Sequence, residues 1–208
     1  MNSQSLLCTK DEQVEDTITT SASPGGVMLD FRLNFEEPQQ KDKPPVVRVK
    51  EGSEVYRSTY DSVVLARKVA QDWTGKSFDK DIVIETVDCK GIHGKSGGML
   101  FTLQFIRKLT GIPLNPEVSG TGIIKADGSI GSAEYVKEKA NAAAKAGCKI
   151  FLHNSSSEED SNYCDNNKEE GIRYIRVSKI DDAWALGSQC RCTVCELIRR
   201  KKEEQCNE

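Results

Sequence analysis

A serine followed by two glycines stands directly before the most apolar segment of the chain. Ser96-Gly97-Gly98 precedes the run Met99–Ile106, and this run ends at Thr110-Gly111-Ile112-Pro113, a helix stop. A helix so apolar is typical of a buried position, so we expect Ser96 where a loop enters the N-terminus of a buried helix. Backbone N–H groups and the positive end of the helix dipole suit a developing oxyanion there. Glycine at 97 and 98 would let a substrate carbonyl approach the backbone closely.

A serine hydroxyl becomes a nucleophile only when an adjacent base accepts its proton. His93 is close to Ser96 in the sequence, but no triad spacing supports it, and we interpret it as a loop residue. Serine–lysine pairs are an accepted variant of the triad. The chain therefore has to be searched for a lysine in apolar surroundings.

The helix predicted over 135–146 carries two lysines in different settings. One turn away on either side, Lys139 faces mainly apolar side chains, whereas Lys137 faces a mixed and more hydrated set. The neighbours of Lys139 are Tyr135, Val136, Ala142 and Ala143, and those of Lys137 are Ala133, Glu134, Ala140 and Asn141. Desolvation lowers an ammonium pKa toward the range in which lysine acts as a base. Lys139 is therefore the better candidate base.

Strands and helices that alternate along the chain must position these residues. Apolar alternation and apolar runs predict strands over 27–35, 46–49, 81–87, 118–124, 149–152 and 172–177, with a short strand at Ile130 after the Asp127-Gly128 turn. Helical spacing predicts helices over 62–73, 99–110, 135–146 and 180–186. The expected class is α/β, or mixed α+β, with small sheets flanked by helices.

The folded domain is expected over residues 26–186. Residues 1–25 are rich in Ser, Thr, Asp and Glu and are interpreted as a mobile leader, and 187–208 as a Cys-rich charged tail. The tail holds Cys190, Cys192, Cys195 and Cys206. Because these do not form paired Cys-x2-Cys knuckles, we expect no metal site and no cofactor, and a zinc site at these four cysteines is the alternative.

Composition excludes several classes of partner. Hydrophobic residues make up 37% and charged residues 29% of the 208, which is typical of a globular domain. The net charge of −3 provides no basic field, so no nucleic-acid partner is expected. Apolar runs fall far short of the roughly 20 residues that span a membrane, and no signal peptide begins the chain. The eight cysteines then favour reduced thiols in the cytoplasm or another intracellular compartment.

Several motifs together resemble the proteolytic domain of Lon proteases. They are Gly94-Lys95-Ser96-Gly97-Gly98-Met99, Leu109-Thr110-Gly111-Ile112-Pro113, Gly120-Thr121-Gly122, Asp127-Gly128, Val136-Lys137-Glu138-Lys139 and Ala142-Ala143-Ala144-Lys145-Ala146-Gly147. The likeness covers roughly residues 60–155 and extends over about 25–182. Its strength lies in ungapped spacing through several motifs, since a lone Ser-Gly-Gly carries no information.

The resemblance implies a role for three side chains. In the family, a lysine 43 positions after the serine accepts its proton, and a threonine 25 positions after the serine helps to position that lysine; Lys139 and Thr121 stand at these separations from Ser96. The resemblance therefore implies Ser96 as nucleophile, Lys139 as general base and Thr121 as an orienting hydroxyl. It also implies polypeptide substrates and assembly as a homo-oligomeric ring.

Two functions follow as hypotheses. The first is a serine-type endopeptidase with a Ser–Lys dyad that acts on unfolded or flexible polypeptides. Because the chain has no Gly-x4-Gly-Lys-Ser/Thr phosphate loop, we expect it to act without ATP. The alternative is a catalytically silent domain that serves as a binding or assembly module. Glu134 and Tyr135 favour the alternative, because they replace a glycine pair of the family and would narrow the substrate groove.

Overall fold

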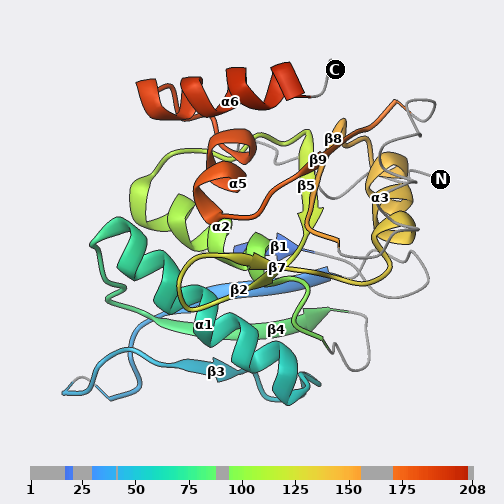
Figure 1. Cartoon of the computed structure of the whole chain (residues 1–208). Coiled ribbons are helices and arrows are strands. Elements are labelled where there is room, and N and C mark those ends of the chain that lie inside the picture. Colours follow the sequence, from blue (N-terminus) through green and yellow to red (C-terminus); the bar gives the residue numbers. More distant parts are fainter. Residues whose placement is uncertain (1–16, 21–29, 41, 88–93, 156–170, 206–208) are drawn as a thin grey trace.

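The computed structural model describes residues 17–20, 30–40, 42–87, 94–155 and 171–205, which form a mixed α/β fold. Its two larger sheets lie in different parts of the molecule, with helices packed between and around them (Figure 1). The first is a four-stranded sheet of order β1-β2-β4-β3, and the second a three-stranded sheet of order β5-β8-β9. The class expected from the sequence is confirmed.

The four-stranded sheet is centred on a long antiparallel pair. β2 (Asp30–Glu36) pairs with β4 (Asp81–Val87), β3 (Val47–Val49) runs parallel to β4, and β1 (Thr17–Thr20) pairs with the other side of β2. Alternate side chains of the central pair, among them Leu33 and Ile84, are buried in the main core. The first two helices of the chain pack on one face of this sheet.

Helices α1 (Arg57–Thr74) and α2 (Gly98–Thr110) pack side by side in the main core. Burial in α2 extends around most of its circumference, as its apolar sequence predicts; Met99, Phe101, Leu103, Phe105 and Ile106 are all buried. Each such side chain contributes about 1.5–3 kcal/mol when fully buried. The N-terminus of α2 is therefore anchored rigidly in the molecule.

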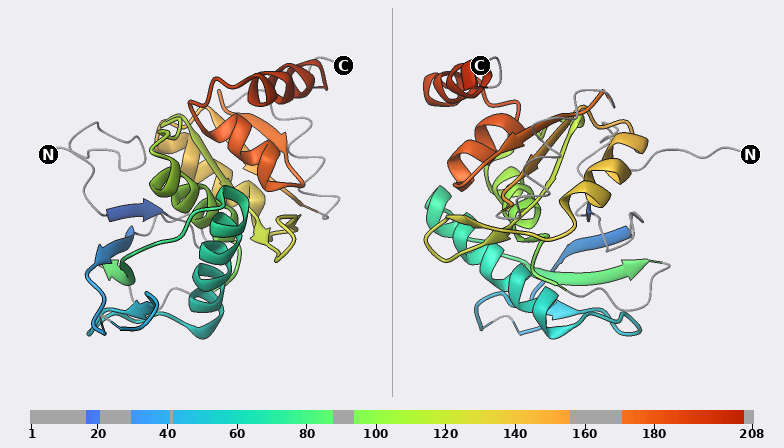
Figure 2. Two further views of the ribbon diagram at one scale, coloured as in Figure 1. Left: turned by 90° about the vertical axis from the view of Figure 1, so that its left-hand side faces the viewer. Right: turned by 45° about the vertical axis from the view of Figure 1, so that its right-hand side comes forward.

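The three-stranded sheet is parallel and covered on both faces. It consists of β5 (Val118–Thr121), β8 (Ile150–His153) and β9 (Arg173–Arg176). α3 (Val136–Lys145), between β5 and β8 in the chain, covers one face, and α2 and α5 (Ile180–Gly187) lie on the other (Figures 1 and 2). Val136, Ala140 and Ala143 of α3 pack with Phe151 in a second core cluster. This packing fixes which face of α3 turns toward the protein interior.

Three differences from the sequence-based expectation stand out. The strand expected over 118–124 is divided into β5 and β6 (Ile123–Ile124), which pairs with β7 (Ile130–Gly131). A four-residue strand, β1, lies inside the segment interpreted as a leader. The segment interpreted as a tail contains a helix, α6 (Thr193–Gln205), packed beyond α5 at the edge of the molecule (Figure 2).

The remaining strands and helices are confirmed, with bounds that shift by a few residues. His93, Cys206 and residues 156–170 lie outside the described residues. Within the described ranges, no helix combines the length and apolar character needed to cross a bilayer.

Candidate active site

Ser96 lies in the turn that leads into α2, and its backbone is tied to the strand segment that follows β5. Its carbonyl oxygen accepts hydrogen bonds from the Gly122 N–H at 2.8 Å and from the Thr121 hydroxyl at 3.2 Å. The Met99 N–H, one turn further along, donates to the Gly122 carbonyl at 3.0 Å. These bonds fix the serine relative to Thr121 in the absence of any substrate.

Polar side chains at the start of α1 hold the loop that precedes the serine. The Ser58 hydroxyl accepts from the Gly94 N–H at 2.9 Å, and the Thr59 hydroxyl donates to the Gly94 carbonyl at 3.1 Å. Ser62 donates to the Lys95 carbonyl at 3.2 Å. Sequence reasoning did not identify these residues. The available signal was the presence of small hydroxyl residues on the helix face that also carries Val63 and Ala66.

Lys139 is 4% exposed, and its ammonium nitrogen points at the serine. The Nζ atom lies 3.1 Å from Oγ of Ser96, 3.3 Å from Oγ1 of Thr121 and 2.8 Å from the carbonyl oxygen of Glu134. Lys137, in contrast, is exposed. The predicted difference in burial between the two lysines is therefore confirmed, and the structure brings together the three side chains expected at the site.

The directions of these hydrogen bonds determine whether Nζ of Lys139 donates or accepts a proton. The Glu134 carbonyl can only accept, and the Thr121 hydroxyl uses its proton toward the Ser96 carbonyl, so it also accepts from Lys139. A neutral amine has two N–H groups and one lone pair. As an ammonium, Nζ donates to Ser96, Thr121 and Glu134 together. As a neutral amine that keeps its two N–H groups on Thr121 and Glu134, it turns its lone pair to the hydroxyl proton of Ser96.

The position of Thr121 depends on a close approach between two strands. A Cβ atom at the preceding residue, Gly120, would lie 2.4 Å from the carbonyl oxygen of Leu152 on β8. Any side chain at 120 would therefore push β5 away from β8 and move Thr121 with it. Thr121 itself is buried and stands in register with His153 of β8.

Of the two glycines after the serine, Gly98 departs from the role expected for it. The Gly98 N–H donates to the Lys95 carbonyl at 3.0 Å, so it is not available to an oxyanion. A Cβ atom at Gly98 would lie 2.8 Å from a methyl carbon of Ile124, so glycine is required there for packing. Among the backbone hydrogen bonds of the described residues, none has the N–H of Ser96 or Gly97 as its donor, which leaves these two groups as candidate oxyanion donors.

Tyr135 immediately precedes α3 in an unusual backbone conformation. Its φ of 58° and ψ of 40° fall in the left-handed region, which disfavours residues with a Cβ atom. Its ring is 50% exposed. The conformation explains in physical terms why glycine would suit this position.

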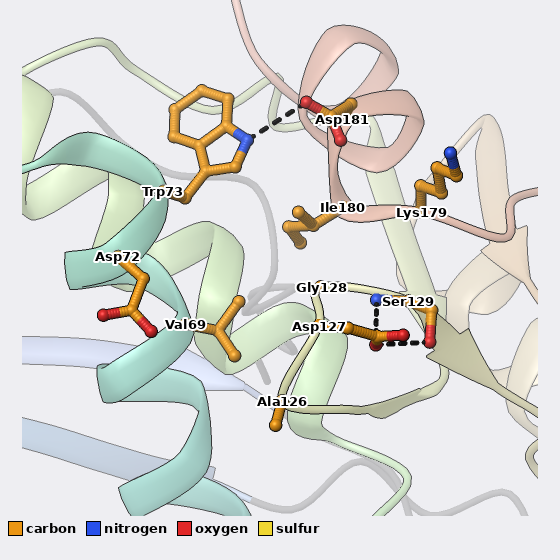
Figure 3. Close-up of a pocket in the computed structure, with 10 residues that line it drawn as sticks. All are labelled: Val69, Asp72, Trp73, Ala126, Asp127, Gly128, Ser129, Lys179, Ile180 and Asp181. Atoms are coloured by element: carbon orange, nitrogen blue, oxygen red, sulfur yellow. Dashed lines mark hydrogen bonds between the residues drawn. The ribbon is translucent and has the colours of Figure 1, made fainter.

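A separate cleft of about 470 Å³ lies between α1, the β6–β7 turn and the start of α5 (Figure 3). Trp73 donates to Asp181 across its rim at 3.2 Å. In the β6–β7 turn, hydrogen bonds from the hydroxyl and the N–H of Ser129 hold the pKa of Asp127 below its ordinary value. Ser96, Thr121 and Lys139 are not among the residues that line this cleft, so it is distinct from the site around Ser96.

Comparisons with known proteins agree with this geometry. The model of the Lon protease (S16) C-terminal proteolytic domain matches residues 58–187, more than half of the chain. Lon protease of Neorickettsia sennetsu is 31% identical over 113 residues, 53% of this chain and 14% of that protein. Lon protease of Mycoplasmopsis agalactiae is 33% identical over 91 residues, 44% of this chain and 9% of that protein. Archaeal Lon protease of Halobacterium salinarum is 24% identical over 157 residues, 76% of this chain and 22% of that protein.

The matched region includes Ser96, Thr121 and Lys139. The chain spans only about a tenth to a fifth of the length of these relatives. The family model and the mixed α/β fold agree with one another. This chain belongs to the Lon protease (S16) C-terminal proteolytic domain family.

Proposed function

We propose that this chain is a serine endopeptidase in which Ser96 is the nucleophile, Lys139 the general base and Thr121 the residue that orients the lysine. The observation that carries the proposal is the 3.1 Å distance between Nζ of Lys139 and Oγ of Ser96. Nucleophile and base within hydrogen-bond reach, with the base oriented by a third group, is the arrangement that covalent catalysis requires.

The reaction uses the groups in sequence. Lys139, as the neutral amine, takes the proton of the Ser96 hydroxyl while Oγ attacks the carbonyl carbon of the peptide bond. Burial favours this neutral form, because a buried ammonium loses its hydration. The proton then passes from Nζ to the leaving amine, and an acyl-serine remains. Water, deprotonated by the same lysine, hydrolyses the ester and restores Ser96.

The developing oxyanion is stabilised at the start of α2. The N–H groups of Ser96 and Gly97 and the positive end of the helix dipole supply this stabilisation. Donors that are already fixed before the substrate binds cost no reorganisation during the reaction. We propose the N–H groups of Ser96 and Gly97 for this role, because the Gly98 N–H already donates to the Lys95 carbonyl.

We further propose that the substrates are unfolded or flexible polypeptides and that cleavage needs no ATP. Every step above uses the dyad and water, and none consumes a nucleotide. The domain is proposed to extend over residues 26–186, from β2 to α5, and to assemble as a homo-oligomeric ring. Light scattering after size-exclusion chromatography measures the assembly state directly.

The test of the activity is cleavage of an unfolded casein-like protein by the purified chain, with and without ATP. We expect equal cleavage in both conditions and none by Ser96→Ala. Cleavage that persists in Ser96→Ala would assign the activity to another residue. Absence of cleavage by the unaltered chain from pH 7 to 9.5 would instead favour a catalytically silent module, the alternative raised by Glu134 and Tyr135.

A further inference from the structure

Three cysteine thiols converge in the segment that joins α5 to α6. The Sγ atoms of Cys190, Cys192 and Cys195 all lie within 4.8 Å of one another, and the three residues form no disulfide. Cys195 is buried, Cys190 is partly buried and Cys192 is exposed, so the group has an inner and an outer side. The cluster lies between the end of α5 and the first turn of α6, which is at the edge of the molecule (Figure 2). Ser96, Thr121 and Lys139 belong instead to the start of α2, to β5 and to α3.

The backbone around the thiols is held by contacts that do not involve sulfur. The guanidinium of Arg199, two turns into α6, donates to the carbonyl oxygens of Ser188 at 3.0 Å and Cys190 at 2.6 Å. The Cys190 N–H donates to the Ser188 hydroxyl at 3.3 Å. The Glu196 N–H donates to the Cys192 carbonyl at 3.0 Å and closes the first turn of α6. The three thiols are thus preorganised by the fold.

The spacing of the sulfurs fits a tetrahedral metal ion. Zinc binds thiolates at about 2.3 Å, which places sulfurs on a tetrahedron about 3.8 Å apart. Sulfurs already within 4.8 Å of one another need to contract by about 1 Å at most to reach that geometry. Because thiolates are soft ligands, they favour zinc over calcium or magnesium.

The three ligands come from one short segment, Cys190-Arg191-Cys192-Thr193-Val194-Cys195. The pKa values of two of these thiols shift in opposite directions: the Cys195 N–H lowers the pKa of Cys192 to about 7, whereas burial raises the pKa of Cys195 to about 12. The proposal therefore rests on the positions of the sulfur atoms.

We propose that Cys190, Cys192 and Cys195 form a zinc-binding site that clamps the N-terminus of α6 to the end of α5. The three thiolates supply three corners of the tetrahedron, and water fills the fourth. The sequence alone predicted no metal here, because paired Cys-x2-Cys knuckles are missing. The third thiol comes instead from Cys190, two residues before the Cys192–Cys195 pair, and the fold brings it beside that pair.

The proposal is tested on the full-length chain, reduced and stripped of metal, by titration with Zn²⁺ against a chelating dye and with Co²⁺. We expect one metal ion per chain and, with Co²⁺, the sulfur-to-cobalt charge-transfer band and the d–d bands of tetrahedral thiolate coordination. Zn²⁺ should also raise the thermal unfolding temperature, since a ligand that binds the native state stabilises it.

Variants separate the cluster from other thiols. Cys192→Ser and Cys190→Ser should each weaken Zn²⁺ binding by more than about 100-fold, since loss of even an outer-shell partner of a metal typically costs 10–100-fold. Cys148→Ala is the matched control, because it removes a buried cysteine from the separate core cluster under α3, and this variant should bind Zn²⁺ as the unaltered chain does.

Three results would overturn the proposal. The first is failure of the reduced chain to take up metal, and the second is equal uptake by Cys192→Ser. The third is isolation of a Cys192–Cys195 disulfide, found by mass spectrometry without prior reduction, in a chain that takes up no metal after reduction; this would assign the pair to redox chemistry instead.

Discussion

The Nζ atom of Lys139 and the Oγ atom of Ser96 lie 3.1 Å apart, although 43 residues separate them in the sequence. The serine is held by the anchored start of α2, and the lysine by α3, which packs on the opposite face of the three-stranded sheet (Figure 1). β5 links the two, because Thr121 contacts both Lys139 and the Ser96 backbone. The geometry of the pair therefore depends on the sheet as much as on either helix.

Lys139→Met should abolish peptide hydrolysis, with kcat/KM lower by at least about 10³-fold, because the base is lost. Met fills a similar volume without a charge, so the thermal unfolding temperature should be equal or higher. Initial rates on an unfolded substrate and thermal unfolding followed by circular dichroism measure the two effects.

Lys137→Ala is the matched control on the exposed face of the same helix and should change the rate by less than about twofold. A larger loss in Lys137→Ala than in Lys139→Met would show that the assigned base is wrong.

Thr121→Val should lower kcat by about 10- to 100-fold with little change in KM. Valine keeps the shape of threonine but removes the hydroxyl that accepts from Lys139 and donates to the Ser96 carbonyl. Thr121→Ser restores the hydroxyl and should recover most of the rate. If valine were harmless, or if serine failed to recover the rate, the role of Thr121 would be in packing.

Asp81→Asn should destabilise the native state by about 2 kcal/mol at pH 7, because a buried carboxylate loses charge-assisted hydrogen bonds. Asp81 is 1% exposed; the Val46 N–H donates to it at 2.9 Å, the Gln39 N–H at 3.3 Å, and Arg48 lies beside it. The bond from Val46 is the main cause that holds the pKa of Asp81 below its ordinary value.

The pH dependence follows from the direction of that shift. A carboxyl group whose pKa is lowered on folding stabilises the native state above its unfolded pKa of about 3.9, and the stabilisation is lost as the pH falls through the folded pKa. Urea unfolding at a series of pH values should therefore show a smaller loss of stability below about pH 4 in Asp81→Asn than in the unaltered chain. Asp79→Asn, at an exposed carboxylate two residues earlier, is the control and should follow the unaltered chain.

Much of the site was predictable from the sequence because it depends on local patterns. The apolar run after Ser96 placed the serine at a helix start, and the apolar neighbours of Lys139 predicted its burial, which the structure confirms. The contacts from Ser58, Thr59 and Ser62 could not be predicted, because they depend on how α1 packs against a loop more than 30 residues away in the sequence.

Two other features depended on tertiary contacts in the same way. The requirement for glycine at 98 comes from Ile124 and the Ser62 hydroxyl, which leave no room for a Cβ atom. Helix α6 is highly charged and shows no strong apolar stripe in the sequence, so it was interpreted as a tail. Its position is decided by packing on α5 and by the hydrogen bonds that Arg199 donates to the preceding loop.

The backbone and the side chains of Glu134 and Tyr135 have different effects on the site. The contact of Glu134 with Nζ of Lys139 is made by its carbonyl oxygen, which any residue at this position would supply. The carboxylate is a negative charge on the residue beside the base, and such a charge favours the protonated lysine if it lies within about 4–6 Å. Tyr135 adds an exposed ring on a backbone conformation that costs a residue with Cβ about 1 kcal/mol.

Glu134→Gly combined with Tyr135→Gly should therefore raise peptidase activity several-fold. It should also lower the pH optimum, which we expect in the alkaline range for the unaltered chain. The carbonyl contact with Lys139 is retained, a negative charge near the base is removed, and an extended substrate gains room. Relief of the left-handed strain offsets the entropic cost of glycine, so the free energy of unfolding should change by less than about 1 kcal/mol. pH–rate profiles on an unfolded substrate and urea unfolding measure these effects. Tyr135→Ala separates them, because it removes the ring but keeps the strained Cβ and the Glu134 carboxylate. It should share the part of the gain in rate that comes from added space, without the relief of strain. An unchanged rate and optimum in the double variant would show that neither side chain faces the substrate.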